Sequence, residues 1–133
     1  MKKQINQVKE FNKVFGVKDV SPTLRYEMIY EELDEYYDSA NCGWDFENCC
    51  EAPDIDKVEQ ADAIGDMLYL VFGAVIDAGL EDKIEAIFDE IHKSNLSKLE
   101  DGKVLRRSDG KVLKGKNYFK PNIKAILDED IRD

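Results

Sequence analysis

The chain has 133 residues, of which 43% are apolar and 36% charged, and this composition is typical of one globular domain. Its 29 acidic and 19 basic side chains give a net charge of −10, which disfavours non-specific binding to nucleic acid or to an anionic membrane. Neither a long apolar run nor an apolar leader is present, so we expect no transmembrane helix, no secretory signal and a cytoplasmic location.

Apolar residues at helical spacing predict the first two helices. The first covers about residues 4–15 and ends at Gly16. The second covers about residues 22–40, with Ser21 as its N-cap and Pro22 at its first position. Residues 41–54 follow as a loop or a broken short helix.

The next helix is expected at about residues 55–78, with a stop at Gly79. Its second half, residues 67–76, is apolar on every side apart from Gly73, which is typical of a central bundle helix or of a subunit interface. A further helix is expected at about residues 81–98, and a last one at about residues 121–127.

The cysteines and the C-terminal segment limit the other possibilities. Cys42, Cys49 and Cys50 lack the spacing of a zinc site or of a disulfide framework, so we expect reduced thiols. Residues 92–124 carry ten basic and three acidic side chains, and two Asp-Gly turns there indicate a hairpin or an ordered tail. The sequence predicts a single all-α domain over 1–133, a bundle of four to five helices with a short irregular or hairpin C-terminal segment. We divide it into a helical body at 1–98 and a basic C-terminal segment at 99–133.

Two of the predicted helices carry carboxylates along one side. Asp66 leads directly into the apolar run, where an ionised carboxylate is costly unless it is paired or bound to a metal. Lys57 is the only basic residue between Tyr26 and Asp82, so salt bridges are scarce. Clustered carboxylates without cysteine or histidine favour Mg²⁺ or Mn²⁺, although one such motif alone is more often solvated surface. The two acidic stripes consist of Glu31, Glu32, Glu35, Glu59, Asp62 and Asp66.

These residues resemble the signature of the all-α nucleoside triphosphate pyrophosphohydrolases. That superfamily includes MazG-like, dimeric dUTPase-like and phosphoribosyl-ATP pyrophosphohydrolase-like proteins, and its signature is Glu-Glu-x-x-Glu, a spacer and Glu-x-x-Asp. The matching stretches here are residues 25–35 and 61–69. The tail is similar to a MazG-like branch through residues 91–98 and 109–115, with Tyr118 and Pro121.

The resemblance implies a MazG-like helical bundle and a set of site residues. It implies metal ligands at Glu32, Glu35 and Asp66. Glu31 is implied as a further ligand or as the base that activates water. Ala63 stands where the signature has its second-helix glutamate, so we expect Asp62, one turn before Asp66, to substitute for it.

Substrate contacts are expected from the tail and from the first helix. Lysines would contact the outer phosphates, hydroxyl and amide groups would donate hydrogen bonds, and an asparagine between two phenylalanines would meet the base edge. Trp44 is a further candidate for stacking on the base. The expected substrate-binding residues are Asn12, Ser94, Asn95, Lys98, Lys111 and Lys114.

The implied reaction splits a standard or modified nucleoside triphosphate into the monophosphate and pyrophosphate, with Mg²⁺ or Mn²⁺ as cofactor and direct attack by water. Nucleotide-pool house-cleaning is one role for it. Two alternatives stay open: a phosphoribosyl-ATP pyrophosphohydrolase, and a non-catalytic acidic protein that binds a cation or a partner. We also expect a homodimer or homotetramer, because small domains bury a limited share of their surface and the resembling family forms such oligomers.

Overall fold

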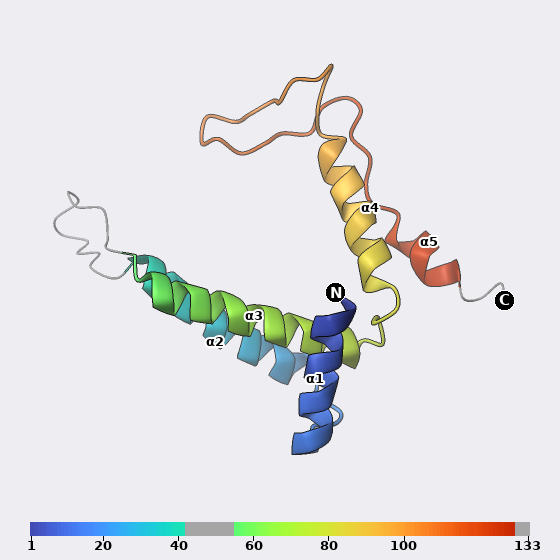
Figure 1. Cartoon of the computed structure of the whole chain (residues 1–133). Coiled ribbons are helices and arrows are strands. Elements are labelled where there is room, and N and C mark those ends of the chain that lie inside the picture. The colour runs from blue at the N-terminus through green and yellow to red at the C-terminus, as the bar shows by residue number, and fades with distance from the viewer. Residues whose placement is uncertain (42–54, 130–133) are drawn as a thin grey trace. The chain divides into compact units, whose positions relative to one another are not determined.

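A computed structural model of the chain describes residues 1–41 and 55–129 (Figure 1). The described residues form five helices and no sheet, so the all-α prediction is confirmed. Every predicted helix is present, with ends shifted by at most a few residues. The helices are α1 (Lys2–Phe15), α2 (Pro22–Asn41), α3 (Lys57–Asp77), α4 (Ile84–Leu96) and α5 (Ile123–Asp128).

The chain divides into two compact units, Met1–Glu81 and Asp82–Asp133. The boundary between these units falls just before α4. The single domain over 1–133, with a body at 1–98 and a basic segment at 99–133, stays a prediction. No helix in residues 1–41 or 55–129 is both long enough and apolar enough to cross a membrane. Of the loop expected at 41–54, Asn41 belongs to α2, and residues 42–54, with Cys42, Cys49, Cys50 and Trp44, lie outside the described residues.

Local signals in the sequence set the helix ends of the first unit. The backbone N–H of Leu24 donates to Ser21 Oγ (3.1 Å), which confirms the predicted N-cap of α2. Gly16 ends α1 in the left-handed conformation, with φ of 64°. The Asp56 carboxylate caps α3 by accepting from the N–H groups of Val58 and Glu59.

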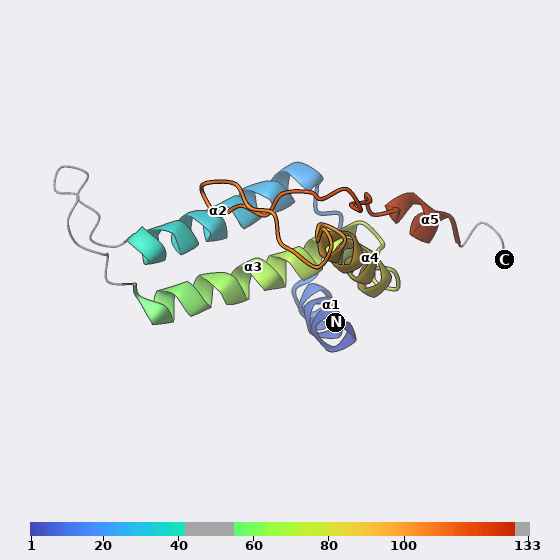
Figure 2. The same ribbon diagram turned by 90° about the horizontal axis from the view of Figure 1, so that it is seen from above.

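Helices α2 and α3 lie antiparallel, side by side, and α1 packs against α3 (Figure 2). The first unit has a small core, formed by Ile5 and Val8 of α1 and by Ala63 and Val75 of α3. The apolar half of α3 is covered on some sides only, since Leu68 is 53% exposed within the chain. Both expectations for this helix, a central position in a bundle and a position at a subunit interface, stay predictions.

The second unit contains α4, α5 and a connecting segment with two turns. Glu100 and Lys103 exchange two backbone hydrogen bonds (2.9 and 2.8 Å) around Asp101 and Gly102, which both have positive φ as a type I′ turn requires. The second Asp-Gly pair closes a wider turn, in which the N–H of Leu113 donates to Leu105 O (2.8 Å). The sequence thus predicted both turns correctly.

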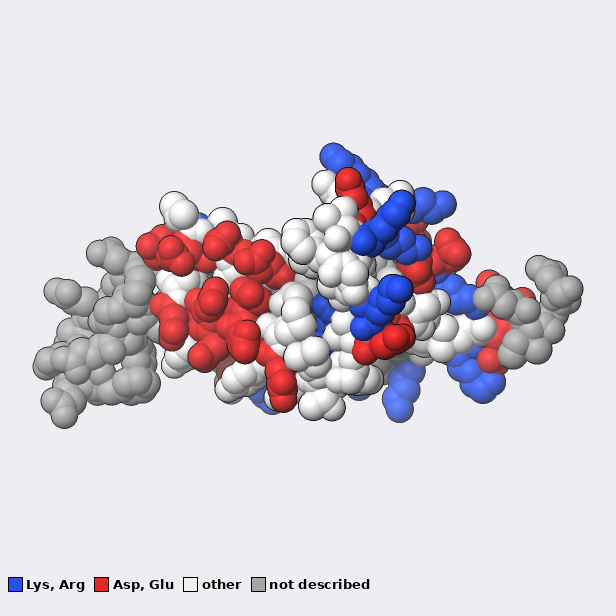
Figure 3. Space-filling model, turned by 90° about the horizontal axis from the view of Figure 1, so that it is seen from below, with Lys and Arg blue, Asp and Glu red and all other residues white. Residues whose placement is uncertain are grey.

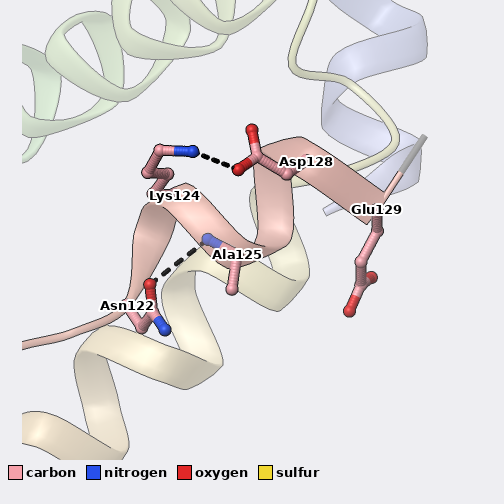
Figure 4. Close-up of a pocket in the computed structure, with 5 residues that line it drawn as sticks. All are labelled: Asn122, Lys124, Ala125, Asp128 and Glu129. Carbon is pink, nitrogen blue, oxygen red and sulfur yellow. Dashed lines mark hydrogen bonds and ion pairs between the residues drawn. The ribbon is translucent and has the colours of Figure 1, made fainter. Parts of the chain in front are cut away.

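Short α5 depends on side chains for its ends. The Asn122 side chain accepts from the N–H of Ala125 (3.2 Å), and Lys124 pairs with Asp128 one turn later (Figure 4). Lys83 Nζ donates to the carbonyl oxygens of Ile126 and Leu127 (3.0 and 2.9 Å), which attaches α5 to the start of α4. Cations near carbonyl groups at a helix C-terminus are stabilising.

Candidate active site

Carboxylates of α2 and α3 gather on one face of the first unit (Figure 3). Glu32 has four carboxylates close enough to act on its charge. We call the five residues the acidic cluster, and they are Glu31, Glu32, Glu35, Asp62 and Asp66. The structure therefore brings together every carboxylate that the sequence assigned to catalysis or to metal binding.

A pocket of about 200 Å³ opens beside the acidic cluster. Glu31, Glu32 and Asp66 supply its polar side. Its apolar side comes from the same two helices, and the lining there is Met28, Tyr69 and Leu70. The Tyr69 ring also meets the Phe11 ring edge to face, with 5.8 Å between centroids, so α1 supports one wall of the pocket.

Glu32 is the carboxylate with the most constrained environment. Its Oε2 atom is buried and lacks a hydrogen-bond partner among the described residues. Burial, followed by the charges of Glu35, Asp66, Asp62 and Glu31, raises the pKa of Glu32 above its ordinary value. A buried carboxylate oxygen without a donor is costly, and a cation is the partner that such an oxygen lacks.

Basic side chains of the first unit, in its described residues 1–41 and 55–81, form their ion pairs and hydrogen bonds away from the acidic cluster. Arg25 forms its ion pair with Asp77 (2.7 Å), and Lys9 pairs with Glu81 (2.9 Å). Lys57 donates to Gln60 (2.9 Å). The shortage of counter-charges predicted from the sequence therefore holds within the described residues of the first unit, 1–41 and 55–81.

The donor chemistry of the acidic cluster fits a hard divalent cation. Every candidate ligand is a carboxylate oxygen, which is what Mg²⁺ and Mn²⁺ prefer. In the described residues these oxygens do not converge into a ready-made group of three or more ligands. Repulsion between like charges favours rotamers that hold the oxygens apart, so ligation requires side-chain movement.

The expected substrate contacts of the second unit lie around the end of α4. The Ser94 hydroxyl is buried and donates to Phe119 O (2.8 Å). Lys98 Nζ donates to Asn95 Oδ1 (2.7 Å), and Lys114 Nζ lies 4.5 Å above the centre of the Tyr118 ring. Ser94 therefore holds the segment around Phe119, which we call the returning chain, against α4. Its hydroxyl could donate to a phosphate only if its hydrogen bond to Phe119 O were broken.

Two more side chains of the second unit hold the same returning chain. The N–H of Phe119 donates to Ser97 Oγ (3.1 Å), and the N–H of Asn122 donates to Glu90 Oε1 (2.9 Å). Glu90 and Ser94 of α4 and Ser97 at its C-cap therefore form one row at helical spacing. Lys111 is exposed and its N–H donates to Asp109 (3.1 Å). The substrate-binding roles of Ser94, Asn95, Lys98, Lys111 and Lys114 stay predictions.

Asn12 lies in a different pocket from the acidic cluster. It lines a space of about 250 Å³ with Ile76, Asp77 and the connection at residues 17–20. Its carbonyl oxygen accepts the N–H groups of Gly16 and Val17, which close the end of α1. Asn12 does not line the pocket beside the acidic cluster. A contact between Asn12 and the base therefore stays a prediction.

A family model for phosphoribosyl-ATP pyrophosphohydrolase matches residues 2–95. The chain belongs to this family. The match includes α1 to α3, the whole acidic cluster and nearly all of α4, and it leaves residues 96–133 outside. No match to the chain was found among curated proteins. The family assignment makes the protein a pyrophosphohydrolase, a hydrolase acting on phosphoric anhydride bonds.

The structure explains the one departure from the superfamily signature. Ala63 is 1% exposed and belongs to the core, so a glutamate there would have to be buried. Asp62 is exposed and contributes to the field at Glu32. This geometry is consistent with Asp62 as the substitute ligand of this pyrophosphohydrolase.

Sequence reasoning missed two groups of residues in the site region. Met28 and Leu70 line the pocket, and helical spacing from Glu32 and Asp66 would have indicated them. Arg25 received no role, although it was the last basic residue before a long stretch almost without any. It proves to be buried between α2 and α3.

We expect Glu32→Gln to raise the free energy of unfolding near neutral pH, because the ionised carboxylate is less stable in the folded protein than in the unfolded chain. The raised pKa means that the folded protein takes up a proton first as the pH falls. Wild type therefore gains stability as the pH falls through the raised pKa, and the gain is complete below the ordinary value of 4.5. The advantage of the variant should shrink over the same interval.

Urea unfolding of both proteins from about pH 4 to about pH 8 measures this difference. The matched control is Glu27→Gln, which removes an exposed glutamate of α2 outside the acidic cluster. If Glu32→Gln and Glu27→Gln change the free energy of unfolding by the same amount at every pH, the environment described for Glu32 is contradicted.

Proposed function

We propose that the protein hydrolyses a nucleoside triphosphate, standard or modified, to the monophosphate and pyrophosphate with the help of Mg²⁺ or Mn²⁺. One observation carries the proposal: a pyrophosphohydrolase chain presents five clustered carboxylates, and one of them has a buried oxygen that finds no partner in residues 1–41 and 55–129. Nucleotide-pool house-cleaning is the role we propose for such an activity.

The cation would be held by Glu32, Glu35, Asp62 and Asp66. When bound, it supplies positive charge that offsets the phosphate oxygens and favours deprotonation of the attacking water. Glu31 lines the pocket, is exposed and is the carboxylate that we assign to accept the proton from water. Met28 and Leu70 form the apolar side of the same pocket.

Aromatic side chains next to the pocket support a ligand with a flat heterocycle. Phe11 and Phe15 are neighbouring rings on α1, 4.5 Å apart between centroids, and Phe11 also contacts Tyr69 of the pocket wall. Phe15 is 68% exposed, so one ring face is accessible. Stacking of a base on an aromatic ring is worth about 1–3 kcal/mol.

The family match favours phosphoribosyl-ATP as a second candidate substrate. It carries the same two recognition elements, a purine ring and a phosphate chain. The similarity of the tail to the MazG-like branch favours a simple triphosphate instead, and this part of the chain lies outside the matched residues. The two substrates differ in the group attached to the purine, so their turnover separates the candidates.

A substrate panel tests the proposal. Purified protein is given standard and modified nucleoside triphosphates and phosphoribosyl-ATP, each with Mg²⁺, with Mn²⁺ or with EDTA, and pyrophosphate and orthophosphate are both quantified. We expect pyrophosphate as the first product, loss of activity in EDTA and recovery on adding Mg²⁺ or Mn²⁺. Full turnover in EDTA, or orthophosphate as the first product, excludes the mechanism.

We further propose that the protein is at least a dimer. Exposed apolar residues recur at three- and four-residue spacing along α2, and each is half or more exposed within the chain. They are Tyr26, Tyr30, Leu33 and Tyr37. A second copy is the simplest cover for such a stripe, and two-fold dimers are the commonest solution. The basic tail would then have a neighbour's site within reach.

A further inference from the structure

The guanidinium of Arg25 lies close against the backbone of α3 at Gly73. The residue is 8% exposed, and its Nε donates to Asp77 Oδ2 (2.7 Å). A Cβ atom added at Gly73 would stand 2.5 Å from Nη1, 2.7 Å from Cζ and 2.9 Å from Nη2 of Arg25. A methyl group cannot occupy that space while the guanidinium stays, so Gly73 forms a socket for Arg25.

The positive charge of the buried Arg25 side chain is also paired with a carboxylate. Asp77 follows Gly73 by one helical turn on α3 and supplies the carboxylate. A buried arginine without such a partner would be strongly destabilising. Arg25 is therefore held by shape at Gly73 and by charge at Asp77, and both contacts fix the first turn of α2 relative to α3.

This contact lies two helical turns from the acidic cluster on both helices. Arg25 precedes Glu32 by seven residues on α2, and Gly73 follows Asp66 by seven residues on α3. The helices are antiparallel, so the Arg25–Gly73 contact and the Glu32–Asp66 pair are equivalent layers about 10.5 Å apart. Fixing the first layer fixes the second.

The Glu32–Asp66 layer requires a contact elsewhere that fixes the register of the two helices. Glu32 and Asp66 line the same pocket, yet their charges repel each other. A slip of one residue along α3 turns its side chains by about 100°, and a slip of one turn moves them by about 5.4 Å. Either slip would separate the carboxylates that a cation must bridge.

We propose that Arg25, Gly73 and Asp77 are positioning residues that set the register of α2 against α3, and so hold Glu32 opposite Asp66 for cation binding. The part about the cation rests on the proposed function. The register itself does not, which allows the two to be tested separately.

The first test compares two glycine-to-alanine changes on the same helix. Gly73→Ala fills the socket, whereas a Cβ at Gly65 meets nothing within 4 Å. Mn²⁺ binding is measured by electron paramagnetic resonance, and helical content by circular dichroism. We expect Gly65→Ala to bind Mn²⁺ as wild type does, and Gly73→Ala to stay helical with at least about tenfold weaker binding.

A second variant guards against a Gly73→Ala protein that fails to fold. Arg25→Lys keeps the positive charge but loses the planar group that fits over Gly73. Val8→Ala is a control for general destabilisation, because Val8 is a buried residue of α1, and α1 packs on α3 through contacts separate from those between α2 and α3. Weaker Mn²⁺ binding in Arg25→Lys, with normal binding in Val8→Ala, supports the proposal. Wild-type binding in a folded Arg25→Lys or Gly73→Ala protein overturns it.

The third test reads the register without any metal. In a protein whose native cysteines are replaced by serine, Glu32→Cys and Asp66→Cys are combined and treated with a short bifunctional thiol cross-linker. We expect rapid cross-linking, and at least about tenfold slower cross-linking when Gly73→Ala is added. Equal rates overturn the proposal. If wild type binds no Mn²⁺ while the rates still differ, the proposed function fails and the register role stands.

Discussion

Asp66→Asn and Glu35→Gln are each expected to lower kcat by about a hundredfold or more, which corresponds to about 2.7 kcal/mol of transition-state stabilisation. Both residues act on the charge of Glu32, and Asp66 lines the pocket beside it. An amide is a weaker ligand than a carboxylate and brings no negative charge, so less cation is held against the substrate. The measurement is pyrophosphate release at saturating substrate and Mg²⁺.

The same variants give a readout that separates ligand loss from unfolding. Each change relieves repulsion in the acidic cluster, so in the absence of metal the variants should be no less stable than wild type. Asp62→Asn tests the substitute for the missing glutamate at Ala63, and wild-type kinetics would remove Asp62 from the ligand set. Near-normal rates in both Asp66→Asn and Glu35→Gln would defeat the whole assignment.

Leu33→Lys is expected to weaken self-association by about a hundredfold or more, because an interface would bury the new charge without a partner. Leu33 is 50% exposed within one chain, so the same change should cost the isolated chain little stability. Sedimentation velocity across micromolar concentrations measures the effect. Wild type should sediment as at least a dimer, and the variant should approach the 15.3 kDa mass of one chain.

Asp34→Lys is the matched control, since it adds the same side chain one position later at a residue that is already charged and exposed. It should associate as wild type does. A wild-type protein that stays at 15.3 kDa at high concentration ends the oligomer proposal, and the basic tail would then act within its own chain.

The sequence by itself determined the features that depend on neighbours along the chain. Ser21 and Gly16 mark helix ends because a hydroxyl can accept an N–H of the first turn, and because glycine adopts positive φ without strain. The two Asp-Gly turns follow from the same backbone chemistry. The side-chain stripes of Glu31–Glu35 and Asp62–Asp66 follow from the period of the helix alone.

Tertiary structure decided what each of those side chains meets. Periodicity could not show that one oxygen of Glu32 is buried without a donor, or that the Ser94 hydroxyl is used by Phe119. Asn12 became a candidate site residue through its place between Phe11 and Phe15, whereas in the folded chain it lines another pocket. Periodicity did not indicate that the guanidinium of Arg25 lies against Gly73. These outcomes depend on contacts between segments that are far apart in sequence, and short-range backbone preferences do not determine such contacts.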